Sequence, residues 1–338
     1  MNFIQTSGPN RIETVTVHPI AASKTGINNH KALAYCVDEK DLPFALFSAS
    51  RAAAMSPNRD FDILICSLEP LKIPSALTDL GIKNQVLDLR KTLEQEKLSL
   101  GWLPVEAYLR LCLPDHLSTK YQRLVYLDTD TDPANADLSQ LFDINLGPFV
   151  LGAVLDKTQW LSLEKPVLDF EERGIDCTKY FNSGVLLIDT KKWISQNVLQ
   201  HLIDEKNRNP DYLFHDQSLL NLTFLGKIAE LSPVWNWQWP NSFRRITRQV
   251  DPAILHYTGI IKPWHAAEKP SWYPQTIIEE FRGFVQRHNL NGQFQKPETG
   301  WVRYPLKTRI EYEVDQLIAG PRIRRLLARY PDPYKAIL

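Results

Sequence analysis

The chain has 338 residues, of which 43% are hydrophobic and 10% aromatic, so it can bury a large core and is not a disordered polypeptide. Its 39 Lys and Arg residues balance its 39 Asp and Glu residues, and this net charge argues against a general nucleic-acid-binding protein. The four cysteines stand far apart with no CxxC pair, which argues against a zinc ribbon or a disulfide framework and favours reduced thiols in the cytoplasm.

Residues 1–30 are polar, and they lack the basic start and apolar stretch of a signal peptide, so they are predicted to be an N-terminal extension. Apolar runs stay well below the ~20 residues that a membrane helix needs. Strands are predicted at 31–37, 61–67, 84–89, 123–127, 149–156 and within 180–193, and helices at 44–55 and 104–113. Because the pattern weakens after residue 285, residues 31–285 are predicted to form the main domain and residues 286–338 a C-terminal tail.

The alternation of strands and helices predicts an α/β domain with a largely parallel sheet. Ligands of such sheets bind outside the carboxyl ends of the strands. Four aspartates fall at predicted strand ends: Asp38, Asp128, Asp130 and Asp156. This edge of the sheet is therefore the predicted binding site.

Three aspartates at alternate positions follow the strand at 123–127: Asp128, Asp130 and Asp132. In extended backbone, side chains two positions apart lie on the same face. Three carboxylates can converge there only if a cation neutralises them, and carboxylate oxygens suit magnesium or manganese. The alternative is that these residues cap a loop and face water, and the short motif alone leaves both interpretations open.

A second enzyme class also places an Asp-x-Asp motif after an apolar strand. In phosphohydrolases of the haloacid-dehalogenase type, the first aspartate, here Asp128, would be the nucleophile. That class usually has Thr or Val two places after the second aspartate, where this chain has Asp132. It also usually carries the motif near the start of the chain, so the motif in this sequence fits that class less well.

Four blocks in this order resemble glycosyltransferase family 8, which includes lipopolysaccharide galactosyl- and glucosyltransferases and glycogenin. They are YLDTDTDPANADLSQLF (126–142), YFNSGVLLIDTKKW (180–193), HDQSLLNLTFLGK (215–227) and ILHYTGIIKPWH (254–265). The resemblance implies a GT-A fold, in which helices flank a Rossmann-like, nucleotide-binding mixed sheet. It also implies a UDP-sugar donor, a divalent metal (Mn²⁺, or Mg²⁺) and transfer of the sugar with retention of configuration.

The family's metal ligands match Asp128, Asp130 and His256, and the resemblance leaves Asp132 as an additional, solvated turn residue before Pro133. Imidazole nitrogen is a reasonable ligand for manganese. The family's phosphate-binding lysine matches Lys262. The resemblance further implies nucleotide contacts at Cys36, Val37, Asp38, Thr129, Gly259 and Lys262.

The donor sugar is expected to contact Arg110, Asn182, Ser183, Gly184, Asp216 and Gln217, and Asp156 matches an acceptor-side carboxylate. Catalytic roles are expected for Gln217, Asp216 and Arg110. An amide is a poor nucleophile, so a covalent intermediate on Gln217 is disfavoured relative to a front-side displacement assisted by the leaving phosphate. The alternative role for Asp216 is a helix N-cap, and both roles could coexist.

The sequence departs from the family pattern at two positions. Asp41 stands where an aromatic residue often stacks on uracil, and Trp102 replaces a histidine eight places before Arg110. These departures leave room for a non-catalytic binder of nucleotide sugars. The Trp-rich stretch at 233–240 is expected either to line the acceptor cleft or to pack in the core.

The tail contains the segment PRIRRLLARY, residues 321–330, in which Pro321 is expected in the first turn of a helix. Ile323, Leu326, Leu327 and Tyr330 follow a helical apolar pattern with arginines on another side. A basic amphipathic helix of this kind could rest on the inner face of a membrane near a glycan or glycolipid acceptor. The alternative is a helix that packs on its own domain or on a second subunit, and the oligomeric state stays open.

Overall fold

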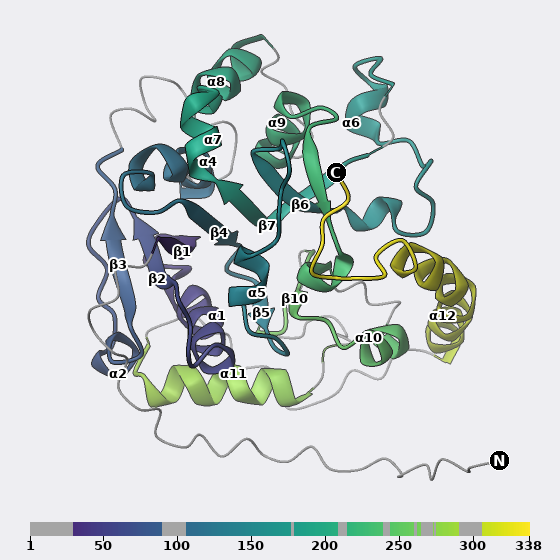
Figure 1. Cartoon of the computed structure of the whole chain (residues 1–338). Coiled ribbons are helices and arrows are strands. Elements are labelled where there is room, and N and C mark those ends of the chain that lie inside the picture. Colours follow the sequence, from purple (N-terminus) through teal and green to yellow (C-terminus); the bar gives the residue numbers. More distant parts are fainter. Residues whose placement is uncertain are drawn as a thin grey trace, which may run out of the picture.

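The computed structural model describes residues 30–89, 106–176, 179–208, 215–238, 244–259, 262–264, 273, 275–290 and 306–338. A seven-stranded sheet with the order β3-β2-β1-β4-β7-β6-β8 runs through it (Figure 1). In that order the strands are β3 Ile82–Val86, β2 Asp62–Ser67, β1 Lys31–Cys36, β4 Arg123–Leu127, β7 Phe181–Asp189, β6 Leu151–Leu155 and β8 Ile228–Leu231.

The sheet is mixed, and this decides which residues meet at its edge. Strand β1 runs parallel to β2 and β4, and β2 runs parallel to β3. Strand β7 is antiparallel to both β4 and β6, and β8 is parallel to β6. The carboxyl ends of β1, β4 and β6 therefore share one edge with the amino end of β7. The predicted α/β fold with its mixed sheet is confirmed.

Helices cover both faces of the sheet. In the view of Figure 1, α1 (Leu42–Met55) and α11 (Gln275–Arg287) lie below it, and α4 (Glu106–Leu117), α7 (Thr190–Ser195), α8 (Val198–Arg208) and α9 (His215–Thr223) lie above it. Phe44 and Phe47 of α1 pack on Phe281 of α11, with ring centroids 5.4 and 5.2 Å apart. Strands β1 and β7 are buried almost throughout, because helices cover them on both sides.

The remaining helices are short except for the last. They are α2 (Ser75–Thr78), α5 (Ser139–Phe142), α6 (Leu168–Glu171), α10 (Arg244–Val250) and α12 (Leu306–Leu327). None of the helices in the described parts of the chain is both long and apolar enough to span a membrane.

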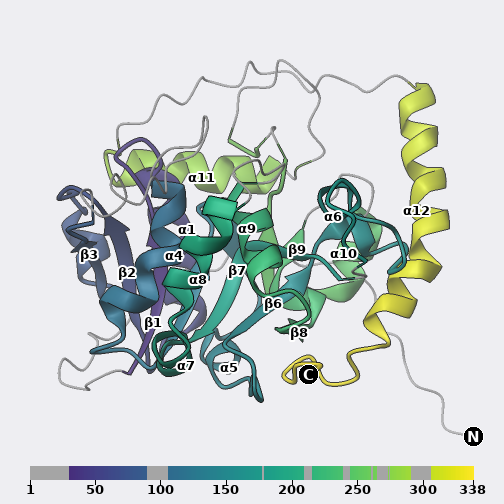
Figure 2. The ribbon, with the colours of Figure 1, turned by 90° about the horizontal axis from the view of Figure 1, so that it is seen from above.

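Helix α12 corrects the prediction for the tail. Pro321 lies inside this helix, not in its first turn, because α12 already begins at Leu306. Ile323, Leu326 and Tyr330 of the predicted apolar face are buried, as expected for a helix that packs on its own domain. Figure 2 shows α12 along one flank of the molecule, and the backbone of Ile337 bridges to Glu230 of β8. That apolar face is therefore covered by protein and is not presented to a lipid surface.

Candidate active site

A second, three-stranded sheet with the order β5-β10-β9 brings distant parts of the chain to the edge of the large sheet. Its strands are β5 Thr131–Pro133, β10 Ile254–His256 and β9 Trp237–Gln238. Strand β5 starts directly after the turn that holds Asp128 and Asp130. It pairs antiparallel with β10, which places Thr131 opposite His256. The backbone pairing of β5 with β10 thus places His256 next to Asp128 and Asp130.

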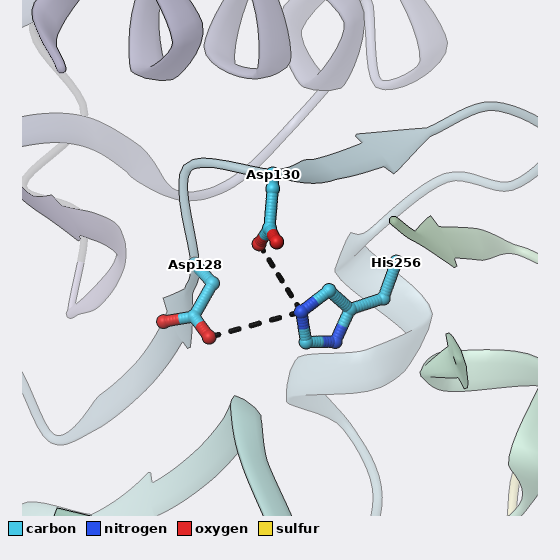
Figure 3. A group of neighbouring side chains, drawn as sticks. All are labelled: Asp128, Asp130 and His256. Atoms are coloured by element: carbon cyan, nitrogen blue, oxygen red, sulfur yellow. Dashed lines mark ion pairs between the residues drawn. The ribbon is translucent and has the colours of Figure 1, made fainter. Parts of the chain in front are cut away.

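Asp128, Asp130 and His256 point toward one another in Figure 3. The Nε2 atom of His256 lies 3.1 Å from Oδ1 of Asp130 and 3.8 Å from Oδ2 of Asp128. One ligand atom from each residue lies within 4.8 Å of the others. Two carboxylate oxygens and one imidazole nitrogen form a donor set that suits a divalent cation such as manganese.

Gly184, near the start of β7, leaves the space that this cluster needs. A Cβ atom at this position would lie 2.2 Å from Cε1 of His256 and 2.8 Å from Oδ2 of Asp128. Any side chain here would therefore push two of the three ligands out of place. The residues present fit a bound cation both in chemistry and in space.

Arg110 of α4 borders the cluster on the side of the large sheet. Its Nη1 atom lies 2.9 Å from Oδ1 of Asp128, and its Nε atom lies 3.3 Å from Oδ2 of Asp216 in α9. Burial alone would lower the pKa of the guanidinium, but the two carboxylates outweigh it and raise this pKa above its usual value. Burial raises the pKa of Asp216. Arg110 therefore holds a fixed positive charge between two carboxylates, and Asp216 is an ion-pair partner of that charge.

Lys262 borders the cluster on the other side. Its Nζ atom forms an ion pair with Asp130 and donates to the carbonyl oxygen of Tyr257 at 2.8 Å. Burial alone would raise the pKa of Asp130, but His256 and Lys262 hold it well below its usual range. Asp130 is therefore ionised and contacts both His256 and Lys262.

The side-chain amides of Asn182 and Gln217 are hydrogen-bonded to each other and to their neighbours in the site. Asn182 donates from Nδ2 to Oε1 of Gln217 at 3.0 Å, and the backbone N–H of Ser183 donates to the same oxygen at 3.1 Å. Gln217 donates from Nε2 to Oδ2 of Asp156 at 3.4 Å. The side chain of Asp156 also accepts from the backbone N–H of Thr158 at 3.0 Å. The expected donor-sugar and acceptor-side residues thus form one connected network.

The expectation that Asp132 is solvated is wrong. Its side chain is only 1% exposed and forms an ion pair with Arg51 of α1. Tyr257 donates its hydroxyl hydrogen to Oδ2 of Asp132 at 3.0 Å. Asp130 lies in the turn before β5, so the alternation of an extended strand does not extend from Asp130 to Asp132. The third aspartate instead links Arg51 of α1 to Tyr257, the residue after β10.

The expected nucleotide-binding residues lie at the end of β1 and in neighbouring turns. Cys36 and Val37 are buried, and the side chain of Asp38 accepts from the backbone N–H of Asp41 at 2.9 Å. Thr129 is half-buried between Asp128 and Asp130 in the chain. Gly259 has a φ of 108°, a conformation that favours glycine. Trp102, one of the two departures from the family pattern, lies outside the described residues.

Sequence reasoning missed two polar residues of the site. Asn236 lies between Trp235 and Trp237, and all three are fully buried, so these two tryptophans belong to the core and not to an acceptor cleft. Lys157 follows Asp156, and its Nζ atom donates to Oγ1 of Thr258 at 2.7 Å. A polar residue within an aromatic run was the available signal for Asn236. For Lys157 the signal was its place next to a strand-end carboxylate.

Solved structures of similar fold are glycosyltransferases. The galactosyltransferase LgtC, solved with donor and acceptor sugar analogs, matches with a TM-score of 0.58 at 21% identity over 83% of this chain and 99% of that chain. The bifunctional glycosyltransferase WbbM matches with a TM-score of 0.59 at 17% identity over 88% of this chain and 53% of that chain. At these identities the likeness establishes the fold, which is the predicted GT-A fold.

Relatives by sequence include general stress protein A of Bacillus subtilis, 29% identical over 56% of this chain and 69% of that protein. Lipopolysaccharide 1,3-galactosyltransferase of Salmonella typhimurium is 26% identical, and the match covers 52% of each chain. Lipopolysaccharide 1,2-glucosyltransferase of Escherichia coli is 30% identical over 48% of this chain and 50% of that protein. The chain thus spans about half the length of these two transferases. The model of glycosyl transferase family 8 matches residues 32–268, and the chain belongs to that family.

Proposed function

We propose that this protein is a metal-dependent hexosyltransferase that moves galactose or glucose from a UDP-sugar to a glycan or glycolipid acceptor, with retention of anomeric configuration. The observation that carries the proposal is the convergence of Asp128, Asp130 and His256 beside Lys262. In this arrangement a metal-binding donor set adjoins a cation suited to phosphate. Lipopolysaccharide transferases among the relatives support a hexose donor and a lipopolysaccharide-like acceptor.

The leaving diphosphate gains negative charge as the sugar bond breaks. A divalent cation held by Asp128, Asp130 and His256 would supply charge stabilisation there, which is commonly the largest catalytic contribution. Lys262 would exchange Asp130 for a phosphate oxygen of the donor. Arg110 would keep Asp128 and Asp216 in place, so that the sugar meets a fixed set of oxygens.

The groups proposed to face the sugar disfavour a covalent intermediate. Gln217 is an amide whose oxygen already accepts two hydrogen bonds, and an amide is a poor nucleophile. Asp216 is engaged with Arg110. We therefore propose a front-side displacement in which the leaving phosphate accepts the proton of the acceptor hydroxyl. Asp156 would bind a hydroxyl of the acceptor.

A cytoplasmic location is part of the proposal. Cys36, Cys66 and Cys112 are free and buried, which is usual for a protein of a reducing compartment. Family membership disfavours the phosphohydrolase alternative. The non-catalytic binder is separated from the enzyme by the experiment below.

The test is hydrolysis of a panel of UDP-sugars, measured as released UDP, first with Mn²⁺ and then with EDTA. We expect slow turnover of one donor that EDTA abolishes and that Asp130→Ala reduces at least about a hundredfold. UDP binding without turnover of any donor, with acceptor glycans present, would favour a binding protein. Absence of UDP binding both with and without metal would refute the proposal. Release of free phosphate would point to the phosphohydrolase.

A further inference from the structure

The second ring nitrogen of His256 faces a side chain that no part of the proposed mechanism uses. Nδ1 of His256 lies 2.9 Å from Oδ1 of Asn236, at the junction of the 3₁₀ turn 233–235 and β9. Asn236 is fully buried and His256 is 3% exposed. A polar pair with so little exposure has no solvent to exchange partners with, so its orientation is set by protein groups.

One backbone hydrogen bond fixes that orientation. The N–H of Gly184 donates at 3.0 Å to the side chain of Asn182, and the accepting atom must be the amide oxygen. The amide of Asn236 lies 2.8 Å from the same oxygen, so it must present its NH₂ group there. Its own oxygen then faces His256. Nδ1 of His256 must therefore carry a hydrogen and donate it to Asn236.

We propose that Asn236 is a positioning residue that holds His256 in the tautomer protonated at Nδ1. The lone pair of Nε2 then points at Asp128 and Asp130, where a cation would bind. Metal-binding histidines commonly donate their other ring N–H to a fixed acceptor, which sets the tautomer and the ring orientation. In this chain the acceptor is an amide oxygen, which adds no negative charge to a site that already has two carboxylates.

A backbone N–H also fixes the amide orientation on the acceptor side. The backbone N–H of Ser183 fixes the oxygen of Gln217, so that Asn182 donates to Gln217 and Gln217 donates to Asp156. Every link from His256 to Asp156 therefore runs in one direction. Asn236 makes two of these hydrogen bonds, one with His256 beside the proposed cation and one with Asn182 beside the proposed donor sugar. Different substitutions of Asn236 distinguish the effects of losing each bond.

This inference rests on the metal site of the proposed function, and its test does not need glycosyl transfer. Asn236→Ala removes both links. Asn236→Asp keeps an acceptor for His256 but loses the N–H that Asn182 receives. Asn84→Ala is the matched control, because the side chain of Asn84 on β3 likewise makes hydrogen bonds, to Ile65, Ser67 and Leu71, away from the site.

Two measurements on the full chain carry the test. Binding of Mn²⁺ without donor is titrated by electron paramagnetic resonance. The tautomer of His256 is measured from the ¹⁵N chemical shifts of metal-free protein labelled at histidine, at a pH high enough for the histidines to be neutral. The His256 signal is identified by its absence from the spectrum of His256→Gln. Near-UV circular dichroism and urea midpoints check that each variant is folded.

We expect Asn236→Ala to lose about tenfold or more in Mn²⁺ affinity and to lose the Nδ1-protonated tautomer. Asn236→Asp should keep that tautomer and bind Mn²⁺ at least as tightly as the parent, while turnover of the UDP-sugar falls. Asn84→Ala should match the parent in both measurements. An Asn236→Ala variant with parental Mn²⁺ affinity and tautomer would overturn the inference. If the parent itself bound no Mn²⁺, the proposed function would fail, and the tautomer measurement would still decide the role of Asn236.

Discussion

The backbone N–H of Tyr257 donates to the carbonyl oxygen of Asp130 at 2.9 Å. This bond joins the residue after His256 to the second aspartate of the candidate metal site, although more than a hundred positions separate them in the chain. The ligand positions therefore depend on backbone pairing between β5 and β10, and side-chain substitutions nearby can disturb the ligands without unfolding the site.

Gly184→Ala should weaken metal binding while the protein stays folded. The new methyl group would lie 2.2 Å from Cε1 of His256 and 2.8 Å from Oδ2 of Asp128, so both side chains would have to shift. We expect Mn²⁺ affinity to fall at least about tenfold, because such sites tolerate displacements of only about 0.5 Å. Calorimetric titration with Mn²⁺ measures this, and unchanged affinity would contradict the geometry described for the cluster.

Gly320→Ala is the matched control for that substitution. Gly320 lies in α12, and a Cβ atom there would meet nothing within 4 Å. Alanine in a helix interior is more favourable than glycine by about 0.5–1 kcal/mol, so the free energy of unfolding should rise by that amount. Mn²⁺ affinity should stay at the parental value.

Arg51→Ala should destabilise the fold more than its surface position suggests. The substitution leaves the carboxylate of Asp132, 1% exposed, with the Tyr257 hydroxyl but without its ion-pair partner. Since removal of one partner from a buried pair costs several kcal/mol, and Arg51 is itself 30% exposed, we expect a loss of about 2–4 kcal/mol in urea unfolding. Glu280→Gln removes the exposed partner of Arg51 and should cost less than about 1 kcal/mol. Equal effects of the two substitutions would contradict the assigned role of Asp132.

The central strands β1, β2, β4, β6 and β7 were predictable because they are short, mainly apolar runs that the fold buries. The burial of Asp132 was not, since it depends on Arg51 and Tyr257, which lie far away in the sequence. Local rules also failed at Pro321, where the buried face of α12 offsets the hydrogen bond that a proline removes from a helix interior.

In the candidate site, too, some residues were predictable from the sequence and others were not. The resemblance to the family placed Asp128, Asp130 and His256, and the structure brings them together. Asn236 was hidden within an aromatic stretch, because its role depends on a hydrogen-bond chain that starts at a backbone N–H in another strand. Neither composition nor spacing carries that information.

Lys157→Ala should weaken UDP binding. The ammonium of Lys157 donates to Thr258. Burial lowers the pKa of Lys157, the carboxylates of Asp156 and Asp130 raise it, and the charge of Lys262 lowers it. This places a second cation beside the proposed phosphate position. We expect a loss of about threefold to tenfold in UDP affinity, the size of one partly solvated charge interaction. Lys120→Ala, which removes an ammonium near Asp62 at the start of β2, should leave the affinity unchanged. If the Lys157 variant and the parent bound UDP with the same affinity at low ionic strength, Lys157 would not contribute to UDP binding.

The buried thiols should make stability decline at alkaline pH. Burial raises the pKa of Cys66 and of Cys112 to about 12, above the ordinary 9.0 of a free thiol. Between these two pH values the unfolded chain releases protons that the folded chain retains, so the stability contribution of each thiol is complete below pH 9 and is lost as pH rises toward 12. Each thiol lowers the free energy of unfolding by up to about 1.4 kcal/mol per pH unit in this window.

Urea unfolding at pH 8, 9, 10 and 11 measures this slope for the parent and for Cys66→Ala. The variant loses some stability at every pH because its core packs less well, and this offset is read at pH 8. Above pH 9 the free energy of unfolding of the variant should fall less steeply with pH than that of the parent. The difference should correspond to one titrating thiol, since alanine has no proton to retain. Parallel curves at all four pH values would show that Cys66 ionises equally in the folded and unfolded chain, contrary to its full burial in β2.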